Sequence, residues 1–70
     1  MITAKQQATL LRDSRIDDVE DEALDEGRFF VHLKQGWDWR QDPHQVTVSK
    51  SFGTYAEVRA ALRQVKAVAA

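Results

Sequence analysis

Cysteine is absent from this chain, proline occurs once, and the three glycines stand apart from one another. Without cysteine the fold has neither disulfides nor thiolate metal sites, so it suits a reducing compartment, for which the cytoplasm is the default. The isolated glycines exclude a glycine-rich phosphate-binding loop, and each suits a turn. We therefore expect a cytoplasmic protein without a bound cofactor.

Long apolar runs are missing too. No stretch approaches the roughly 20 apolar residues that a membrane-spanning helix needs. Residues 1–7 lack the charged start and apolar run of a signal peptide. The sequence predicts neither a membrane partner nor export by a signal peptide.

The residues that are present suffice for one small globular domain, residues 1–70. Of the 70 residues, 43% are hydrophobic and 30% are charged, a balance typical of folded chains. A chain of this length buries only roughly 60% of its unfolded surface, so a deep catalytic cleft is hard to accommodate.

The net charge of −1 conceals an uneven distribution. Residues 1–27 carry three cationic and eight anionic side chains, whereas residues 28–70 carry seven and three. Seven of the ten residues from 17 to 26 are acidic. The favoured interpretation is that the two halves neutralise each other within the fold, and the alternative is that one half is a binding surface.

Residues 28–50 hold both tryptophans, both histidines and two of the three phenylalanines, and they predict a β-hairpin. Three apolar residues have the period of two of a half-buried strand and are expected to face inward: Phe29, Val31 and Leu33. Asp42 and Pro43 are typical of a type I turn. Beyond the turn, Val46 and Val48 predict the returning strand, on the same inward face.

Gly36 decides where the two tryptophans lie. If the first strand continues past Gly36, Trp37 and Trp39 stay in phase with the inward residues and join the core. If the strand stops at Gly36, both tryptophans lie in a loop. We favour the core, because a small domain needs the large area that an indole buries.

Residues 14–27 fit either a helix or a strand. In the helix, Ser14 is the cap, Gly27 ends it, and one face carries Ile16, Val19 and Ala23. In the other interpretation a short edge strand lies within Asp18–Asp25, and the loop Asp25, Glu26, Gly27 follows with its glycine in the left-handed conformation. We favour the strand, because a third strand stabilises the hairpin and acidic edge residues oppose aggregation.

Both ends of the chain predict a helix with a capping box. Thr3 and Gln6 begin the first helix, which runs to about Asp13 with a narrow apolar stripe of Ala4, Ala8 and Leu11 and with Leu10 at the edge of the stripe. Thr54 and Glu57 begin the second helix, whose apolar stripe is expected to cover the inward face of the sheet over Phe29, Val31, Val46 and Val48. This stripe consists of Tyr55, Val58, Leu62, Val65 and Ala69, flanked by Ala61 and Val68.

Together these elements predict an α+β fold in the order helix, three antiparallel strands, helix (αβββα), with the helices packed on one face of the sheet. This order resembles that of double-stranded-RNA-binding domains. The final helix of that family starts with lysine-rich sequence, whereas Thr54 to Glu57 stand at this position here. The resemblance is therefore limited to the order of elements and does not assign the chain to the family.

Candidate catalytic and metal-binding groups have unspecific spacing. His32 and His44, with Asp38 and Asp42 between them, include neither a His-x-His pair nor an i, i+4 pair, so we favour solvent-facing histidines over a metal site. Ser49, His32 and Asp42 contain the groups of a hydrolase, but no nucleophile-elbow pattern surrounds the serine. We expect a protein that is not an enzyme.

Two sets of residues suggest a binding surface. Alongside Arg28, the outward sheet face carries Phe30, His32 and Lys34, and the final helix is expected to present Arg59, Arg63 and Lys66 along one edge. Aromatic rings flanked by cations on an exposed sheet are typical of single-stranded nucleic-acid binding. Against this stand the acidic run and a pI of about 6.0. Alternatively, the three cations of the helix pair with the acidic run.

The favoured interpretation is a small regulatory module that binds another protein or forms a homodimer, with nucleic acid as the alternative partner. Phe30 has no place in the core if Phe29 faces inward, and an exposed aromatic residue marks an interface. Ala56, Ala60 and Ala67 give the final helix a smooth second face, which seats either the first helix or another chain. In a variant of this hypothesis, the acidic run occupies a basic partner by imitating nucleic-acid charge.

Overall fold

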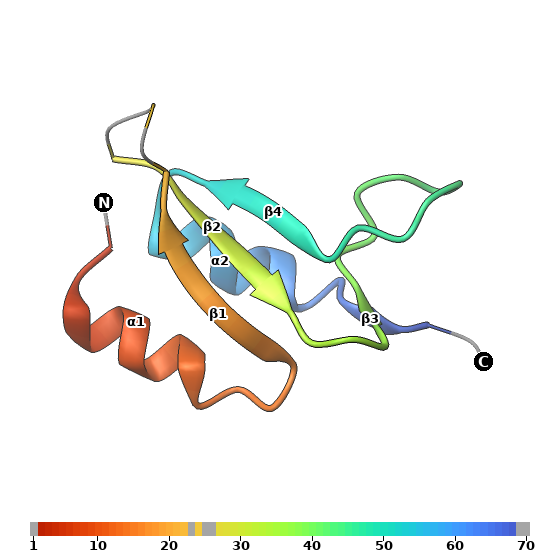
Figure 1. The fold of residues 1–70 in the computed structure, drawn as a ribbon, viewed down its shortest axis with the longest axis horizontal. Coiled ribbons are helices and arrows are strands. Elements are labelled where there is room, and N and C mark those ends of the chain that lie inside the picture. Colours follow the sequence, from red (N-terminus) through yellow and green to blue (C-terminus); the bar gives the residue numbers. More distant parts are fainter. Residues whose placement is uncertain (1, 23, 25–26, 69–70) are drawn as a thin grey trace.

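Three antiparallel strands form the main sheet of this computed structural model, which describes residues 2–22, 24 and 27–68. The sheet order is β1-β2-β4, and a second sheet pairs β3 with β5. As Figure 1 shows, α1 runs beside β1 and α2 lies behind the sheet. The elements are α1 (Ala4–Leu11), β1 (Ile16–Asp21), β2 (Phe29–Leu33), β3 (Trp37–Asp38), β4 (Ser49–Phe52), α2 (Tyr55–Leu62) and β5 (Lys66–Ala67). The predicted α+β architecture is confirmed, and the small second sheet is an addition to it.

Strand β2 is the centre of the sheet and alternates as predicted. Its inward residues Phe29, Val31 and Leu33 are all buried. On one side Val31 is opposite Val19 of β1, and on the other it is opposite Lys50 of β4. The prediction that these three side chains share the core face is confirmed.

Strand β1 is the predicted acidic edge strand, and it begins two residues earlier than expected. Its pairing with β2 contains an irregularity between Ile16 and Asp18, so that Ile16 and Val19 are both buried although they are three residues apart. A β-bulge has this effect, because the extra residue shifts the alternation by one. Gly27 has the expected left-handed φ of 84°, whereas Asp25 and Glu26 of the predicted loop lie outside the described residues.

The prediction that Val46 and Val48 cover the core is wrong. Their side chains are 54% and 42% exposed, and β4 contributes Phe52 to the core instead. The loop before β4 is tied to Asp38, whose Oδ1 accepts hydrogen bonds from the backbone N–H groups of Arg40 and Thr47, both 2.9 Å long. At the end of the loop, the Val48 carbonyl accepts from the Leu33 N–H of β2 at 2.7 Å. The predicted turn lies within this loop, where the Asp42 carboxylate accepts from the His44 N–H at 2.8 Å.

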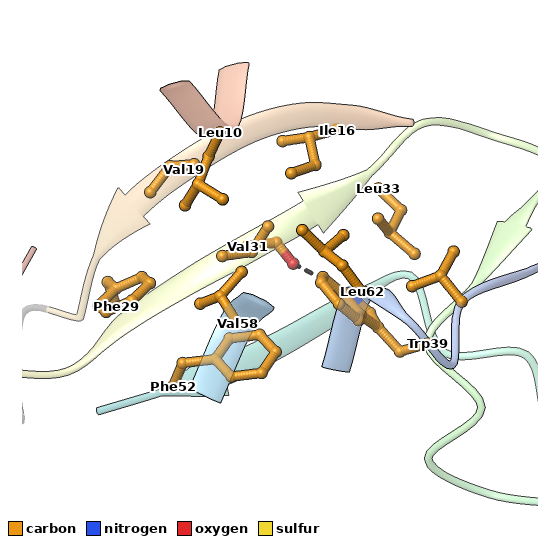
Figure 2. Close-up of a cluster of buried hydrophobic side chains, with 11 residues drawn as sticks. Leu10, Ile16, Val19, Phe29, Val31, Leu33, Trp39, Phe52, Val58 and Leu62 are labelled. Atoms are coloured by element: carbon orange, nitrogen blue, oxygen red, sulfur yellow. Dashed lines mark hydrogen bonds between the residues drawn. The ribbon is translucent and has the colours of Figure 1, made fainter. Parts of the chain in front are cut away.

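Trp39 fills the core position that the valines leave. Its indole Nε1 donates to the Val31 carbonyl at 3.2 Å, and its ring meets Phe52 edge-on with 5.1 Å between centroids. Figure 2 shows the indole among the buried side chains, with its bond to Val31 dashed. Trp37 is only half-buried, against the rim of the core. The prediction of a core position is thus confirmed for Trp39, even though β2 ends at Leu33 before the turn at Gly36.

The apolar stripe predicted for α1 is wrong by one position. The capping box of Thr3 and Gln6 is confirmed, with bonds of 3.0 and 3.1 Å, but Leu10 is 1% exposed and Leu11 is 43% exposed. The helix packs along the edge of β1, where the Gln7 amide donates to the Val19 carbonyl at 3.3 Å. This hydrogen bond turns the side of the helix with Leu10 inward and leaves the predicted stripe in solvent.

Helix α2 is shorter than predicted and ends at Leu62. The Thr54 cap is confirmed, but the Glu57 carboxylate accepts from the Gly53 N–H at 2.9 Å instead of completing the box with Thr54. Val58, Leu62 and Val65 are buried as predicted. Beyond the helix the chain becomes β5, so Val68 pairs its N–H with the Gly36 carbonyl and its side chain is exposed. Ala69 lies outside the described residues.

Leu10 and Leu11 test the orientation of α1. Replacing Leu10 with alanine should lower the free energy of unfolding by about 3 kcal/mol, because a buried leucine loses its contacts and leaves a cavity. Leu11→Ala, the matched control, should cost less than about 1 kcal/mol. Urea unfolding measures both, and equal losses would contradict the observed orientation.

Trp39 and Trp37 form a second matched pair. Trp39→Phe removes a buried hydrogen bond and part of the ring volume, so it should destabilise the fold by about 2 kcal/mol or more. Trp37→Phe should cost about 1 kcal/mol or less, because its ring is already half in solvent. Chemical denaturation followed by circular dichroism gives both values. A larger loss of stability for Trp37→Phe than for Trp39→Phe would contradict the core position of Trp39.

Candidate functional site

The outward face of the main sheet is the candidate binding surface. Side chains on this face belong to the positions between the core residues, and paired residues of neighbouring strands share a face. The core residues of both helices gather on the other side of the sheet. The outward face presents Asp18, Glu20, Phe30, His32, Ser49 and Ser51.

Phe30 lies at the centre of this face. It is opposite Glu20 on β1 and Ser51 on β4. Its ring stacks on that of His32, with 6.1 Å between centroids and 24° between the planes. Phe30 is half-buried among these neighbours, so part of an aromatic side chain remains accessible to solvent on this face.

His32 links all three strands on one side of Phe30. Its Nδ1 lies 2.6 Å from the Ser49 hydroxyl, and its Nε2 lies 3.4 Å from the Glu20 carboxylate. A neutral imidazole can donate to only one of these partners, so the hydroxyl and the carboxylate together determine its tautomer. The contacts hold the imidazole ring beside that of Phe30.

A second polar network crosses the sheet on the other side of Phe30. The Arg28 Nε donates to the Ser51 hydroxyl at 3.0 Å, and this hydroxyl donates to the Glu22 carboxylate at 2.9 Å. The Arg28 and Glu22 groups are also 3.7 Å apart. Phe30 therefore lies between two hydrogen-bonded networks that limit its rotamers and its neighbours' movement.

Ser49, His32 and Glu20 contain the chemical groups of a hydrolytic triad, although the sequence pointed to Asp42 as the acid. Asp42 instead belongs to the turn before β4. Catalysis of acyl transfer also requires oxyanion donors beside a bound substrate. Two hollows lie within the described part of the chain, one around Val46 and one around Arg59, and neither is lined by Ser49, His32 or Glu20. What the structure shows of the three groups is a link between strands β1, β2 and β4.

His44, Asp38 and Asp42 are also placed by the structure. His44 is exposed in the loop, away from His32 on the sheet, and the described residues contain no cluster of three or more potential metal ligands. The hydrogen bonds from the backbone N–H groups of Thr47 and Arg40 lower the pKa of Asp38. The Asp38 carboxylate thus stabilises the conformation of the loop before β4.

The basic residues predicted for the surface do not join Phe30 and His32. Lys34 is exposed just beyond β2, and its backbone N–H donates to the Arg15 carbonyl at 2.8 Å. The expected edge of Arg59, Arg63 and Lys66 is wrong, because α2 ends before Lys66, which lies in β5. Arg59 and Arg63 are exposed on α2, in the layer behind the sheet.

The acidic run is partly neutralised by the second half of the chain, but by other residues than expected. Glu22 forms an ion pair with Arg28, and the Glu20 carboxylate lies 3.4 Å from the His32 Nε2. In the described ranges, no ion pair joins the run to Arg59, Arg63 or Lys66. The sequence indicated Phe30 and His32 but missed Glu20, Ser49 and Ser51, whose contribution follows from strand register, which the bulge in β1 obscured.

Asp13 and Arg15 form the shortest described ion pair, 2.8 Å, near the ends of both helices. The guanidinium also donates from Nε to Asp13 at 3.0 Å and from Nη1 to the Leu62 carbonyl at 3.1 Å. The hydrogen bonds that Asp13 accepts from Arg15 lower the pKa of the Asp13 carboxyl, although partial burial acts to raise it. The positive charge of Arg59 lowers this pKa further.

No protein-family model, no curated protein and no solved structure matches the chain. Within the part of the chain that the structure describes, no helix has the length and apolar composition needed to cross a membrane.

The lowered pKa of Asp13 predicts a pH-dependent contribution to stability. A depressed carboxyl pKa stabilises the fold above the unfolded value of about 3.8, and this contribution disappears as pH falls through the folded value. Asp13→Asn should therefore cost about 1 kcal/mol at neutral pH and little below the folded pKa. Urea unfolding of both proteins from neutral to strongly acidic pH tests this. A stability difference that does not change with pH would contradict it.

Proposed function

We propose that the chain is a small, non-enzymatic protein-binding module whose outward sheet face contacts a cationic surface of another protein. The observation that carries this proposal is the partly exposed position of Phe30 between two polar networks. Aromatic residues held in this way lose little conformational entropy on binding, which is why they dominate interface energetics.

The charge of this face indicates the chemistry of the partner. Asp18 and Glu20 lie on β1 opposite His32 and Phe30, and both carboxylates are exposed. A lysine or arginine of the partner can pair with these groups while an apolar side chain covers Phe30. This arrangement agrees with the hypothesis that the acidic run meets a basic protein, and charge complementarity would speed the encounter.

Self-association through this face is less favourable than binding to a different protein. In a two-fold symmetric dimer the same patch meets itself, so the carboxylates of Asp18 and Glu20 would approach their own copies. The exposed Ala56 and Ala60 of α2 offer another surface for a homodimer. Ala67 is not part of that surface, since it belongs to β5.

Nucleic acid is the weaker alternative. Stacking of bases on Phe30 would require cations nearby for the phosphates. The neighbours of Phe30 on β1 are carboxylates, and the nearby Arg28 is paired with Glu22. Arg59 and Arg63 are in the helical layer behind the sheet. The charge beside the aromatic ring therefore opposes a polyanion.

The proposal is tested with Phe30→Thr, which retains strand propensity but removes the ring. The control is Val46→Thr, which changes an exposed apolar residue away from this face. We expect a partner purified by affinity to the native chain to bind the control normally and Phe30→Thr about tenfold to a hundredfold more weakly in calorimetry. Unchanged affinity of Phe30→Thr would refute the role of this face.

Mobility shifts test the alternative with single-stranded and duplex DNA and RNA at low salt. We expect no shift at concentrations of the protein that saturate the partner. A shift that Phe30→Thr abolishes and Val46→Thr retains would replace the proposal with nucleic-acid binding.

A further inference from the structure

A basic hollow lies on the helical side of the molecule, where the ends of α1 and α2 approach each other. Its volume is about 340 Å³, and it is lined by Asp13, Arg15, Arg59, Leu62, Arg63 and Val65. The space is many times the roughly 30 Å³ that one water molecule occupies in the liquid. It can therefore hold a small polyatomic ion together with some of its hydration water.

Arg15 is a fixed cation in this hollow. Three of its N–H groups are used, two by the Asp13 carboxylate and one by the Leu62 carbonyl. Its guanidinium also lies 5.9 Å from the centre of the Trp37 ring. A guanidinium has five N–H groups, so two donors remain for a ligand on a side chain that is already held in place.

Arg59 and Arg63 are the free cations. Arg59 lies on α2, and Arg63 is the C-cap residue directly after it, still with helical backbone angles. The two are four residues apart, so their side chains emerge on the same side of the helix. In the described part of the chain, no hydrogen bond or ion pair engages either guanidinium. Nor are they needed to cap the helix, because its last carbonyls already accept bonds from the backbone N–H groups of Arg63, Gln64 and Val65 and from Arg15.

The charge of the hollow selects the ligand. Three guanidinium groups and one carboxylate leave a net charge of +2. We propose that this hollow binds one doubly charged phosphate group, either the free ion or a phosphate monoester, with Arg59 and Arg63 as its main ligands. Guanidinium groups suit this role because their planar donors meet phosphate oxygens two at a time.

A phosphate monoester fits better than the phosphodiester backbone of nucleic acid. A diester carries one charge per group and is bound along a track of cations. Here the cations converge on one hollow instead of following a track. The proposal does not depend on the binding of a partner protein at Phe30, which is on the other face of the sheet.

Titration of the ¹⁵N-labelled protein with inorganic phosphate tests the proposal. At about pH 8 and constant ionic strength, we expect saturable shifts of the Arg59 and Arg63 side-chain N–H signals, with no comparable shifts at Phe30 or Ser49. O-phosphoserine in a parallel titration distinguishes the two sources of the group. Tighter binding of O-phosphoserine assigns the hollow to a monoester, and equal or weaker binding assigns it to the free ion.

Arg59, Arg63 and Lys5 are exposed, so we expect their substitution to leave the fold intact. We expect Arg59→Ala and Arg63→Ala each to weaken phosphate binding about tenfold. Arg59→Lys should cause a smaller loss, because the charge stays and only the forked geometry is lost. Lys5→Ala, which removes an exposed charge from α1, is the control and should leave the affinity unchanged.

Two results would overturn the site. One is a set of shifts that does not saturate and that sodium chloride reproduces at the same ionic strength. The other is tighter binding of a single-stranded oligonucleotide without a terminal phosphate, which would show a general polyanion surface. Neither result bears on the partner-binding test with Phe30→Thr.

Discussion

The indole of Trp39, bonded to the Val31 carbonyl beneath the sheet, is the contact on which the rest of the structure depends. It joins the segment after β3 to the middle of the central strand and packs against Phe52 and the core side of α2 (Figure 2). Because the indole fills this position, the following loop is free to leave the sheet and return as β4. The indole lies on the side of β2 that carries the buried Phe29, Val31 and Leu33, so Phe30 and His32 are on the opposite side.

The two sides of the sheet consequently differ in chemistry. The inner side is apolar and closed by helices, whereas the outer side holds polar groups that are hydrogen-bonded to each other around one aromatic ring. Such links between strands resist rearrangement, so the outer surface is largely formed before any partner binds. The basic hollow lies on the helical side of the molecule. A protein with both sites could bind a partner protein and a phosphate group independently.

Much of the fold can be predicted from local sequence patterns. The predictions that were wrong all concern residues whose positions depend on contacts between segments far apart in the sequence. Alternation placed Phe29, Val31 and Leu33 correctly, and both helix starts were evident from Thr3 and Thr54. Leu10 and Leu11 could not be separated by periodicity, because the hydrogen bond of Gln7 to β1 turns the helix. Val46 and Val48 have the pattern of a core strand, but the choice between them and Trp39 depends on packing between distant segments. The candidate surface was only half predictable for the same reason, since Glu20 and Ser49 reach His32 through strand register.

Hydrogen exchange of the two indole protons tests the assignment of inner and outer faces most directly. We expect the Trp39 proton to exchange as slowly as the amides of β2, because it is released only when the core opens. The Trp37 proton, whose ring is half-buried, should exchange much faster. Rapid exchange of both protons, or slow exchange of Trp37 alone, would contradict the placement of Trp39 and with it the exposure of Phe30.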